Sequence, residues 1–176
     1  MTTTSINHLA EPSAAPSPDE ILRRILRRHA SGVTAITVPG PAGFTATSFT
    51  SVSLHPALVS FCLGATASTA DAVQRADRFA VHILGVDNTA LARQFARSGI
   101  DRFAGVPYLQ ESDGLPVLTG VPAWLTARTA SVQRIGDHLL VVGEVESGEV
   151  REEATALVYH EGAFAAVSQL VRPTSE

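Results

Sequence analysis

Residues 123–150 read "AWLTARTASVQRIGDHLLVVGEVESGEV", and this stretch holds two long segments that are typical of β-strands. Only Gly136 and Asp137 separate the segments 123–135 and 138–150, and a Gly-Asp pair between two strands indicates a tight hairpin. Strands joined by so short a turn must run antiparallel. The stretch therefore predicts an antiparallel sheet that contains one long hairpin.

Shorter segments on both sides of this hairpin are also typical of strands. They cover 32–38, 43–49, 57–63 and 79–84, with a C-terminal pair at 156–167 that turns at Glu161-Gly162 and closes the sheet.

Helical patterns are short and few. One begins at Ser17, where Pro18 and Glu20 complete a capping box, and others cover 68–76, with Ser68 as the cap, and 88–98. This order lacks the regular strand–helix alternation of a parallel sheet. We therefore expect a mainly β fold with short helices, in which hairpins form a closed or partly closed antiparallel barrel.

The length of 176 residues suits one domain. Residues 1–16 are rich in Thr, Ser, Ala and Pro and predict a flexible N-terminal arm, and residues 171–176 predict a short tail. The domain itself is expected to cover 17–170. Charged residues make up only 17% of the chain, so we expect a second subunit to cover part of its neutral surface.

Charge and hydropathy exclude several classes of partner and location. The net charge of −4 offers no basic surface for nucleic acid. The N-terminus lacks the basic and apolar regions of a secretory signal, and no apolar run approaches the roughly 18 residues of a membrane span. The lone Cys62 allows no intrachain disulfide. We expect a soluble, cytoplasmic protein.

Several familiar catalytic motifs do not occur in the sequence. There is no P-loop, no G-x-G-x-x-G after a strand and no G-x-S-x-G elbow. The histidines show no H-x-x-x-H or H-E-x-x-H spacing, so we expect no metal site. Cys62 lies inside an apolar strand, where a cysteine is usually a small core residue.

Residues 43–53, "GFTATSFTSVS", carry six hydroxyl side chains between Thr45 and Ser53 without a charged residue. Such hydroxyls can bond to nearby backbone groups or decorate an exposed strand. Alternatively, hydroxyls and backbone N–H groups can surround a polar ligand such as a ribityl phosphate. Composition alone favours the first interpretation.

The order of several segments adds a second line of argument. The chain reads "GVTAIT", "GFTATSFTSVSLHPALVSFCL", "STADAV", "RFAVHIL", "LARQFA", "DRFAGV" and "GDHLLVVGEV" in succession. From about Arg28 to Ala166 it resembles the flavin reductase-like family, the small reductase components of two-component flavin-dependent monooxygenases. This resemblance implies an FMN-binding split β-barrel of antiparallel Greek-key type and a homodimer.

The resemblance also implies which residues meet the ligands. Those expected around the flavin ring and ribityl chain are Thr45, Ala46, Thr47 and Ser48, with Ser53, Cys62 and Leu63 beside them. Those expected near the phosphate are Ser68, Thr69, Arg102 and Phe103. For Arg102, a surface salt bridge with Asp101 or another acid is an equal alternative.

The turn formed by Gly136, Asp137 and His138 corresponds to the place where the family stacks the nicotinamide. The resemblance makes His138 the catalytic candidate, although the turn alone would be taken as an ordinary hairpin end. The implied reaction is hydride transfer from C4 of NADH or NADPH to N5 of FMN or FAD, with protein groups orienting the two rings. The reduced flavin would then diffuse to a partner monooxygenase.

Two other functions stay open at this point. A flavin carrier or sensor would bind FMN without turnover, and a plain structural domain would bind no flavin at all.

Overall fold

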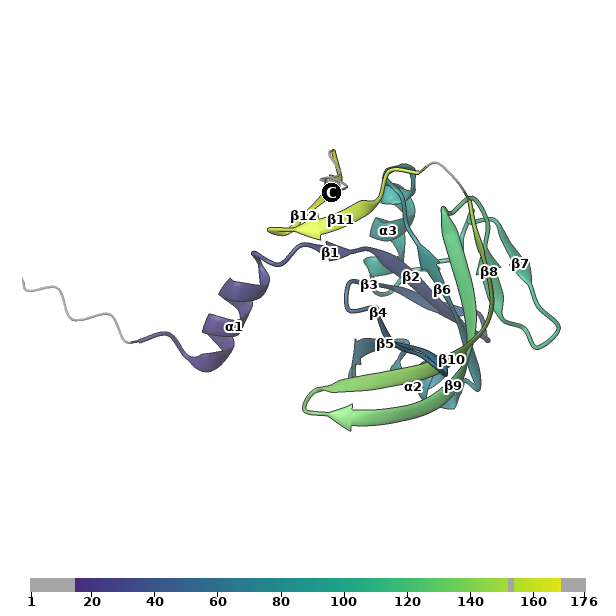
Figure 1. Cartoon of the computed structure of the whole chain (residues 1–176), viewed down its shortest axis with the longest axis horizontal. Helices are drawn as coiled ribbons and strands as arrows, with labels where there is room; N and C mark the ends of the chain where they lie inside the picture. Colours follow the sequence, from purple (N-terminus) through teal and green to yellow (C-terminus); the bar gives the residue numbers. More distant parts are fainter. Residues whose placement is uncertain (1–14, 152–153, 169–176) are drawn as a thin grey trace, which may run out of the picture.

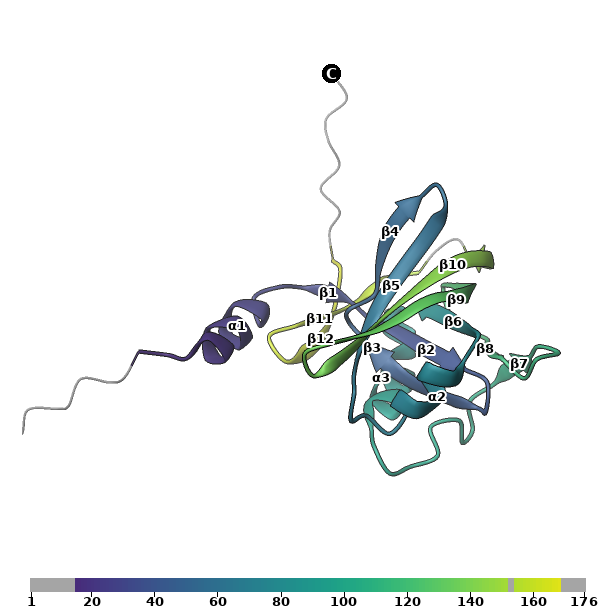
Figure 2. The same ribbon diagram turned by 90° about the horizontal axis from the view of Figure 1, so that it is seen from below.

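The computed structural model describes residues 15–151 and 154–168, and Figures 1 and 2 show it as a mainly β structure with few helices. The predicted tail 171–176 and residues 1–14 of the predicted arm lie outside the described residues.

One antiparallel sheet of seven strands forms the body of the molecule. Its strands, in spatial order, are β3 (Ala42–Ala46), β2 (Thr34–Val38), β6 (Arg78–Ile83), β9 (Ala123–Ile135), β10 (His138–Val150), β5 (Ala57–Gly64) and β4 (Thr50–Leu54). The predicted long hairpin is confirmed as β9 and β10, with the expected bounds. The sheet's two edge strands, β3 and β4, are joined by only the residues 47–49, so the sheet must curl until its edges approach each other.

The core lies on both faces of this curled sheet. Since successive side chains of a strand point to opposite faces, Ile36 and Ala35 of β2 belong to two different apolar clusters. Ile36 packs inside the curl with Phe61 and Phe79, whereas Ala35 lies in the cluster that includes Phe95 of α3 (Thr89–Ala96). All five residues of β2 are therefore buried.

The helices are α1 (Pro18–Leu26), α2 (Ala70–Arg75), the single 3₁₀ turn η1 (Val86–Asn88) and α3. The capping box at Ser17 and Glu20 is confirmed, and the helix predicted at 88–98 forms as η1 and α3. The prediction that Ser68 caps α2 is wrong, because the helix begins two residues later with Thr69 at the N-cap position and no side-chain cap. The Ser68 hydroxyl instead accepts a hydrogen bond from Arg102.

The C-terminal strands β11 (Leu157–His160) and β12 (Ala163–Ala166) turn at Glu161 and Gly162 as predicted, but they do not close the main sheet. They form a separate three-stranded sheet with β1 (Ser31–Gly32). The predicted strand 32–38 divides at Val33, whose N–H donates to Leu157 O while its carbonyl accepts from Leu84 N. The short pair β7 (Tyr108–Gln110) and β8 (Pro116–Leu118) is an addition that the pattern did not indicate.

A buried histidine joins the sheet to β8. Nδ1 of His82 donates to Ala35 O (3.0 Å), and Nε2 accepts from the N–H of Leu118 (2.9 Å). One ring nitrogen is thus a donor and the other an acceptor, which is the neutral tautomer. Burial lowers the pKa of His82 to about 4, so the ring is a structural link in the core.

Candidate functional site

The end of β5 brings together predicted residues from three separate segments. The Ser48 hydroxyl accepts from Cys62 N (2.9 Å) and donates to Cys62 O (3.0 Å), and so continues the β4–β5 pairing with a side chain. On the other side of β5, Gly64 pairs with His138 of β10. The loop 47–49 and the turn before β10 therefore flank the last residues of β5, among them Leu63.

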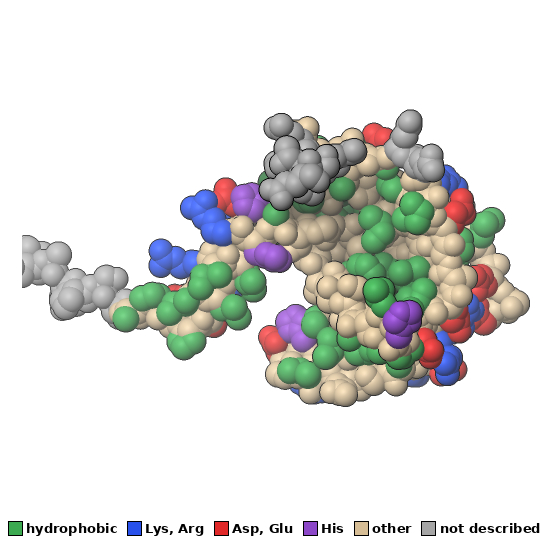
Figure 3. All heavy atoms as spheres, in the orientation of Figure 1, with side chains coloured by type: hydrophobic (Ala, Val, Ile, Leu, Met, Phe, Trp, Pro, Cys, Tyr) green, Lys and Arg blue, Asp and Glu red, His purple; other side chains and the backbone are tan. Residues whose placement is uncertain are grey.

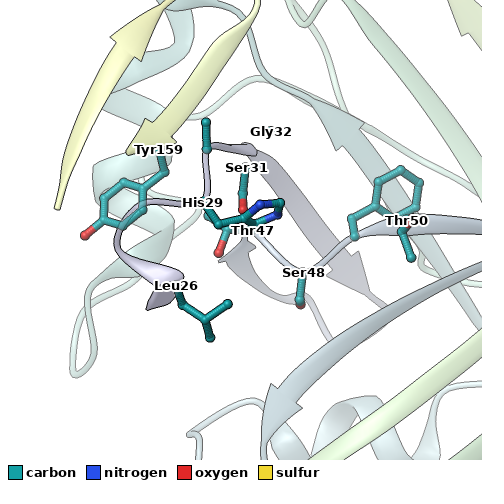
Figure 4. A pocket seen from close by; sticks show the side chains of 10 residues that line it. Leu26, His29, Ser31, Gly32, Thr47, Ser48, Thr50 and Tyr159 are labelled. Atoms are coloured by element: carbon teal, nitrogen blue, oxygen red, sulfur yellow. The ribbon is translucent and has the colours of Figure 1, made fainter. Parts of the chain in front are cut away.

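A cavity of about 560 Å³ opens at the loop 47–49 (Figure 4). Figure 4 shows Leu26 and Tyr159 at one end of it and Ser48 and Thr50 at the other. Its lining mixes hydroxyls, an imidazole and apolar groups from four elements: Leu26, His29, Ala30, Ser31, Gly32, Thr47, Ser48, Phe49, Thr50 and Tyr159. The space-filling view shows the molecule hollowed between the part that carries α1 and β1 and the tip of the β9–β10 hairpin (Figure 3).

The hydroxyl run divides between backbone bonding and the cavity. Thr45 Oγ1 donates to Ala92 O (2.6 Å), and Ser53 Oγ accepts from His55 N (3.2 Å). The Ala46 side chain is buried, so only its main chain could meet a ligand. Thr47 is exposed at the cavity, and its hydroxyl has no hydrogen-bond partner within 15–151 and 154–168. The backbone interpretation thus holds for Thr45 and Ser53, whereas a contact between Thr47 and a ligand stays a prediction.

A second hollow, of about 360 Å³, contains all four residues expected near a phosphate. Ser68 and Thr69 line it from the residues just before α2, and Arg102 and Phe103 line it from the segment that follows α3. The Phe103 ring packs edge-on against Phe95 (5.2 Å between centroids) and Tyr108 (5.4 Å). Phe103 therefore anchors this wall through its packing.

The Arg102 guanidinium is held by neutral groups. Nε donates to Arg97 O (2.6 Å), Nη1 donates to Gly43 O (2.8 Å), and Nη2 lies 3.4 Å from Ser68 Oγ. The alternative salt bridge does not form with any described acid, and the Asp101 carboxylate instead accepts from Phe103 N. Partial burial lowers the pKa of Arg102, yet an arginine stays protonated in proteins. A fixed positive charge without a carboxylate partner suits an anionic ligand.

The turn between β9 and β10 presents an imidazole. Gly136 has a φ of +60°, which the tight turn requires, and Ala65 N donates to Asp137 O (2.9 Å). Nδ1 of His138 donates to Asp137 Oδ1 (2.7 Å), and this hydrogen bond lowers the pKa of the Asp137 carboxyl. Half of the His138 side chain is exposed (51%), and Nε2 has no partner in the described part of the chain. Nε2 is therefore available to a ligand.

The sequence analysis did not assign several residues that line the larger cavity, among them Leu26, His29 and Tyr159. Tyr159 reaches the cavity because β11 pairs with β1, where it lies opposite Ser31. No local pattern signals that pairing.

The fold and the site define a class of small β proteins with an open cavity rimmed by hydroxyls and, in a neighbouring hollow, a guanidinium held by neutral groups. The chain belongs to the family described as flavin reductase like domain, whose model matches residues 26–168.

Individual relatives support the same assignment. The chain is 43% identical over 150 residues to an NADH:FMN oxidoreductase of Rhodococcus qingshengii, covering 81% of this chain and 78% of the relative. It is 36% identical to HsaB, the reductase subunit of a flavin-dependent monooxygenase of Rhodococcus jostii, covering 78% and 72%. Among solved structures, the NADH:FAD oxidoreductase SgcE6 of Streptomyces globisporus superposes with a TM-score of 0.80 at 33% identity, covering 90% and 99%.

Within residues 15–151 and 154–168, no helix is both long and apolar enough to cross a membrane, and no group of three or more His, Cys, Asp or Glu side chains could hold a metal ion.

Proposed function

We propose that this protein is an NAD(P)H-dependent flavin reductase that reduces FMN, and also accepts FAD, by hydride transfer. One observation carries the proposal: a positive charge, on Arg102, and a hydroxyl, on Thr47, lie at two places along the same strand. Arg102 bonds to Gly43 on β3, and Thr47 follows the end of the same strand at the larger cavity. Thr47 lies four residues after Gly43, and four residues of extended chain span about 13 Å. This spacing would let the phosphate of one ligand meet Arg102 while its flat polar ring meets Thr47.

The residues present fit a flavin. Arg102 and the Ser68 hydroxyl would hold the phosphate, while Thr47 and the main chain of 47–49 would meet the polar ring edge. When bound, the flavin accepts a hydride at N5 from reduced nicotinamide, so the protein needs no nucleophile of its own. His138 would orient the nicotinamide through Nε2, and its hydrogen bond to Asp137 fixes the ring for that task.

The reduced flavin would leave and diffuse to a partner monooxygenase. The likeness to HsaB, a reductase subunit by name, supports this role. The proposal places the protein in the cytoplasm, to which the single cysteine is suited. A flavin carrier without turnover is the alternative function.

The direct test is anaerobic addition of NADH to the purified protein with FMN. Catalysed loss of the oxidised flavin absorption is expected, and binding of FMN without that loss would favour the carrier.

His138→Ala should lower kcat/KM for the reduced nicotinamide about tenfold, because one hydrogen bond of about 1.4 kcal/mol is removed. FMN affinity should stay within twofold, since the imidazole is assigned to the other ring. Steady-state kinetics and FMN titration measure both quantities. His55→Ala changes an exposed histidine at the far end of β5 and serves as the matched control. If the two variants have the same kcat/KM, His138 does not contact the nicotinamide and the turn is an ordinary hairpin end.

We further propose that the curled sheet is the split barrel of Greek-key type and that 17–170 forms the domain. The protein is proposed to act as a homodimer. Figure 1 shows α1 standing away from the sheet, and none of its residues is buried. Its apolar face is exposed, with Ile25 at 61% and Leu22 at 57%. A second copy of the chain would cover this face.

Light scattering should give about twice the chain mass of 18.5 kDa. Ile25→Glu should shift the particle towards the monomer, because a charge would then have to be buried. Arg24→Glu places the same charge on a neighbouring residue outside the apolar stripe and should remain dimeric. A monomeric wild-type protein at micromolar concentration would contradict the proposal.

A further inference from the structure

The arginine assigned to the phosphate lies in a segment with no helix or strand. Residues 97–107 connect α3 to β7 without regular backbone bonding. Such a segment needs specific side-chain contacts if it is to hold a charged group in one place.

Gln94 of α3 supplies two of these contacts. Its Nε2 donates to Arg102 O and to Ala104 O, both at 2.9 Å. Both amide protons are therefore used, and the opposite amide orientation would turn Oε1 towards two carbonyl oxygens. The two hydrogen bonds hold the main chain immediately before and after Phe103.

These bonds belong to a closed set of contacts beside the phosphate hollow, in which its lining residues Gly43 and Arg102 take part. Thr45 of β3 donates to Ala92 O of α3, and Arg102 Nη1 donates to Gly43 O of β3. Strand, helix and loop are thus each tied to the other two. Gln94 is the side chain of α3 that sets the main-chain position of Arg102.

We infer that Gln94 is a positioning residue that tunes recognition of the flavin phosphate through Arg102. The inference rests on the proposed function, because it needs Arg102 to meet that phosphate. Without the Gln94 amide, Phe103 still packs on Phe95 and holds the segment to the body. The carbonyls of Arg102 and Ala104 lose their donor, so the main chain of Arg102 is less firmly placed and its guanidinium is positioned only by its own bonds to Arg97, Gly43 and Ser68.

The test compares FMN with riboflavin, which has the same ring and ribityl chain but no phosphate. Gln94→Met keeps the side-chain length and removes both donors, so the Kd for FMN should rise about five- to tenfold. The Kd for riboflavin should stay within twofold. Gln110→Met makes the same chemical change at an exposed glutamine of β7 and should leave both values unchanged.

Three results would overturn the inference or its foundation. If Gln94→Met weakens FMN and riboflavin equally, Gln94 has only a structural role. If Arg102→Ala loses the preference for FMN while Gln94→Met keeps it, the positioning role is wrong although the phosphate assignment stands. If Arg102→Ala keeps the preference, the phosphate assignment itself fails. Should Gln94→Met not fold, Gln94→Leu removes the same donors without adding a charge and is read in the same way.

Discussion

Arg102→Ala should weaken FMN binding by about 10- to 150-fold. A hydrogen bond that involves a charged group contributes roughly 1.5–3 kcal/mol, and this change removes the only cation among the residues that line the phosphate hollow. Riboflavin affinity should change far less, because that ligand carries no phosphate. Fluorescence titration of both flavins measures the difference directly.

Matched variants separate charge from geometry at this position. Arg102→Lys keeps the positive charge but cannot reproduce the bonds of Nε and Nη1 to two carbonyls, so an intermediate FMN affinity is expected. Arg93→Ala removes an exposed arginine from α3 and should leave the FMN Kd within twofold. FMN affinity that survives Arg102→Ala would place the phosphate elsewhere.

Gly143→Ala should reduce the free energy of unfolding by about 2–3 kcal/mol, towards the upper end of the usual cost of overpacking a core. A Cβ on Gly143 would overlap the ring of Phe79 and lie 3.1 Å from Ala127 Cβ. Phe79 is fully buried, and its ring packs edge-on against Phe61 at 5.1 Å, so a shift of the ring would disturb this packing. Urea unfolding measures the loss.

Gly64→Ala is the control, since no atom lies within 4 Å of the Cβ that it would add. Both glycines lie in strands of the same sheet, so the two changes share their effect on backbone freedom. The control should stay within about 0.5 kcal/mol of the wild type. A similar loss in both variants would show that backbone freedom, and not the contact with Phe79, decides the result.

The structure changes the hypothesis about how Thr47 and Ser48 share the contact with the flavin. The sequence analysis assigned both Thr47 and Ser48 to the flavin, but the Ser48 hydroxyl already bonds to both backbone groups of Cys62. Ser48 can still accept one further hydrogen bond, because a hydroxyl has two lone pairs. Its two bonds to Cys62 fix the loop that carries Thr47 at the cavity.

Local patterns were sufficient where each signal and its partner lie close together in the chain. The hairpin 123–150 was predicted with its bounds because two strands and a two-residue turn are adjacent. The capping box of Ser17 and Glu20 spans three residues and was equally readable. The order of motifs from about Arg28 to Ala166 was sufficient to recognise the family.

Only the tertiary structure decided contacts between residues that are far apart in sequence. The C-terminal hairpin joins β1 because the chain divides at Val33, and Gly143 must remain small because the curl places Phe79 against it. The pairing of Gln94 with the carbonyl of Arg102 depends in the same way on where an irregular segment folds back. Periodicity and capping depend on residues that are neighbours along the chain. The curl of the sheet determines which distant residues come into contact, and the candidate site consists of such contacts.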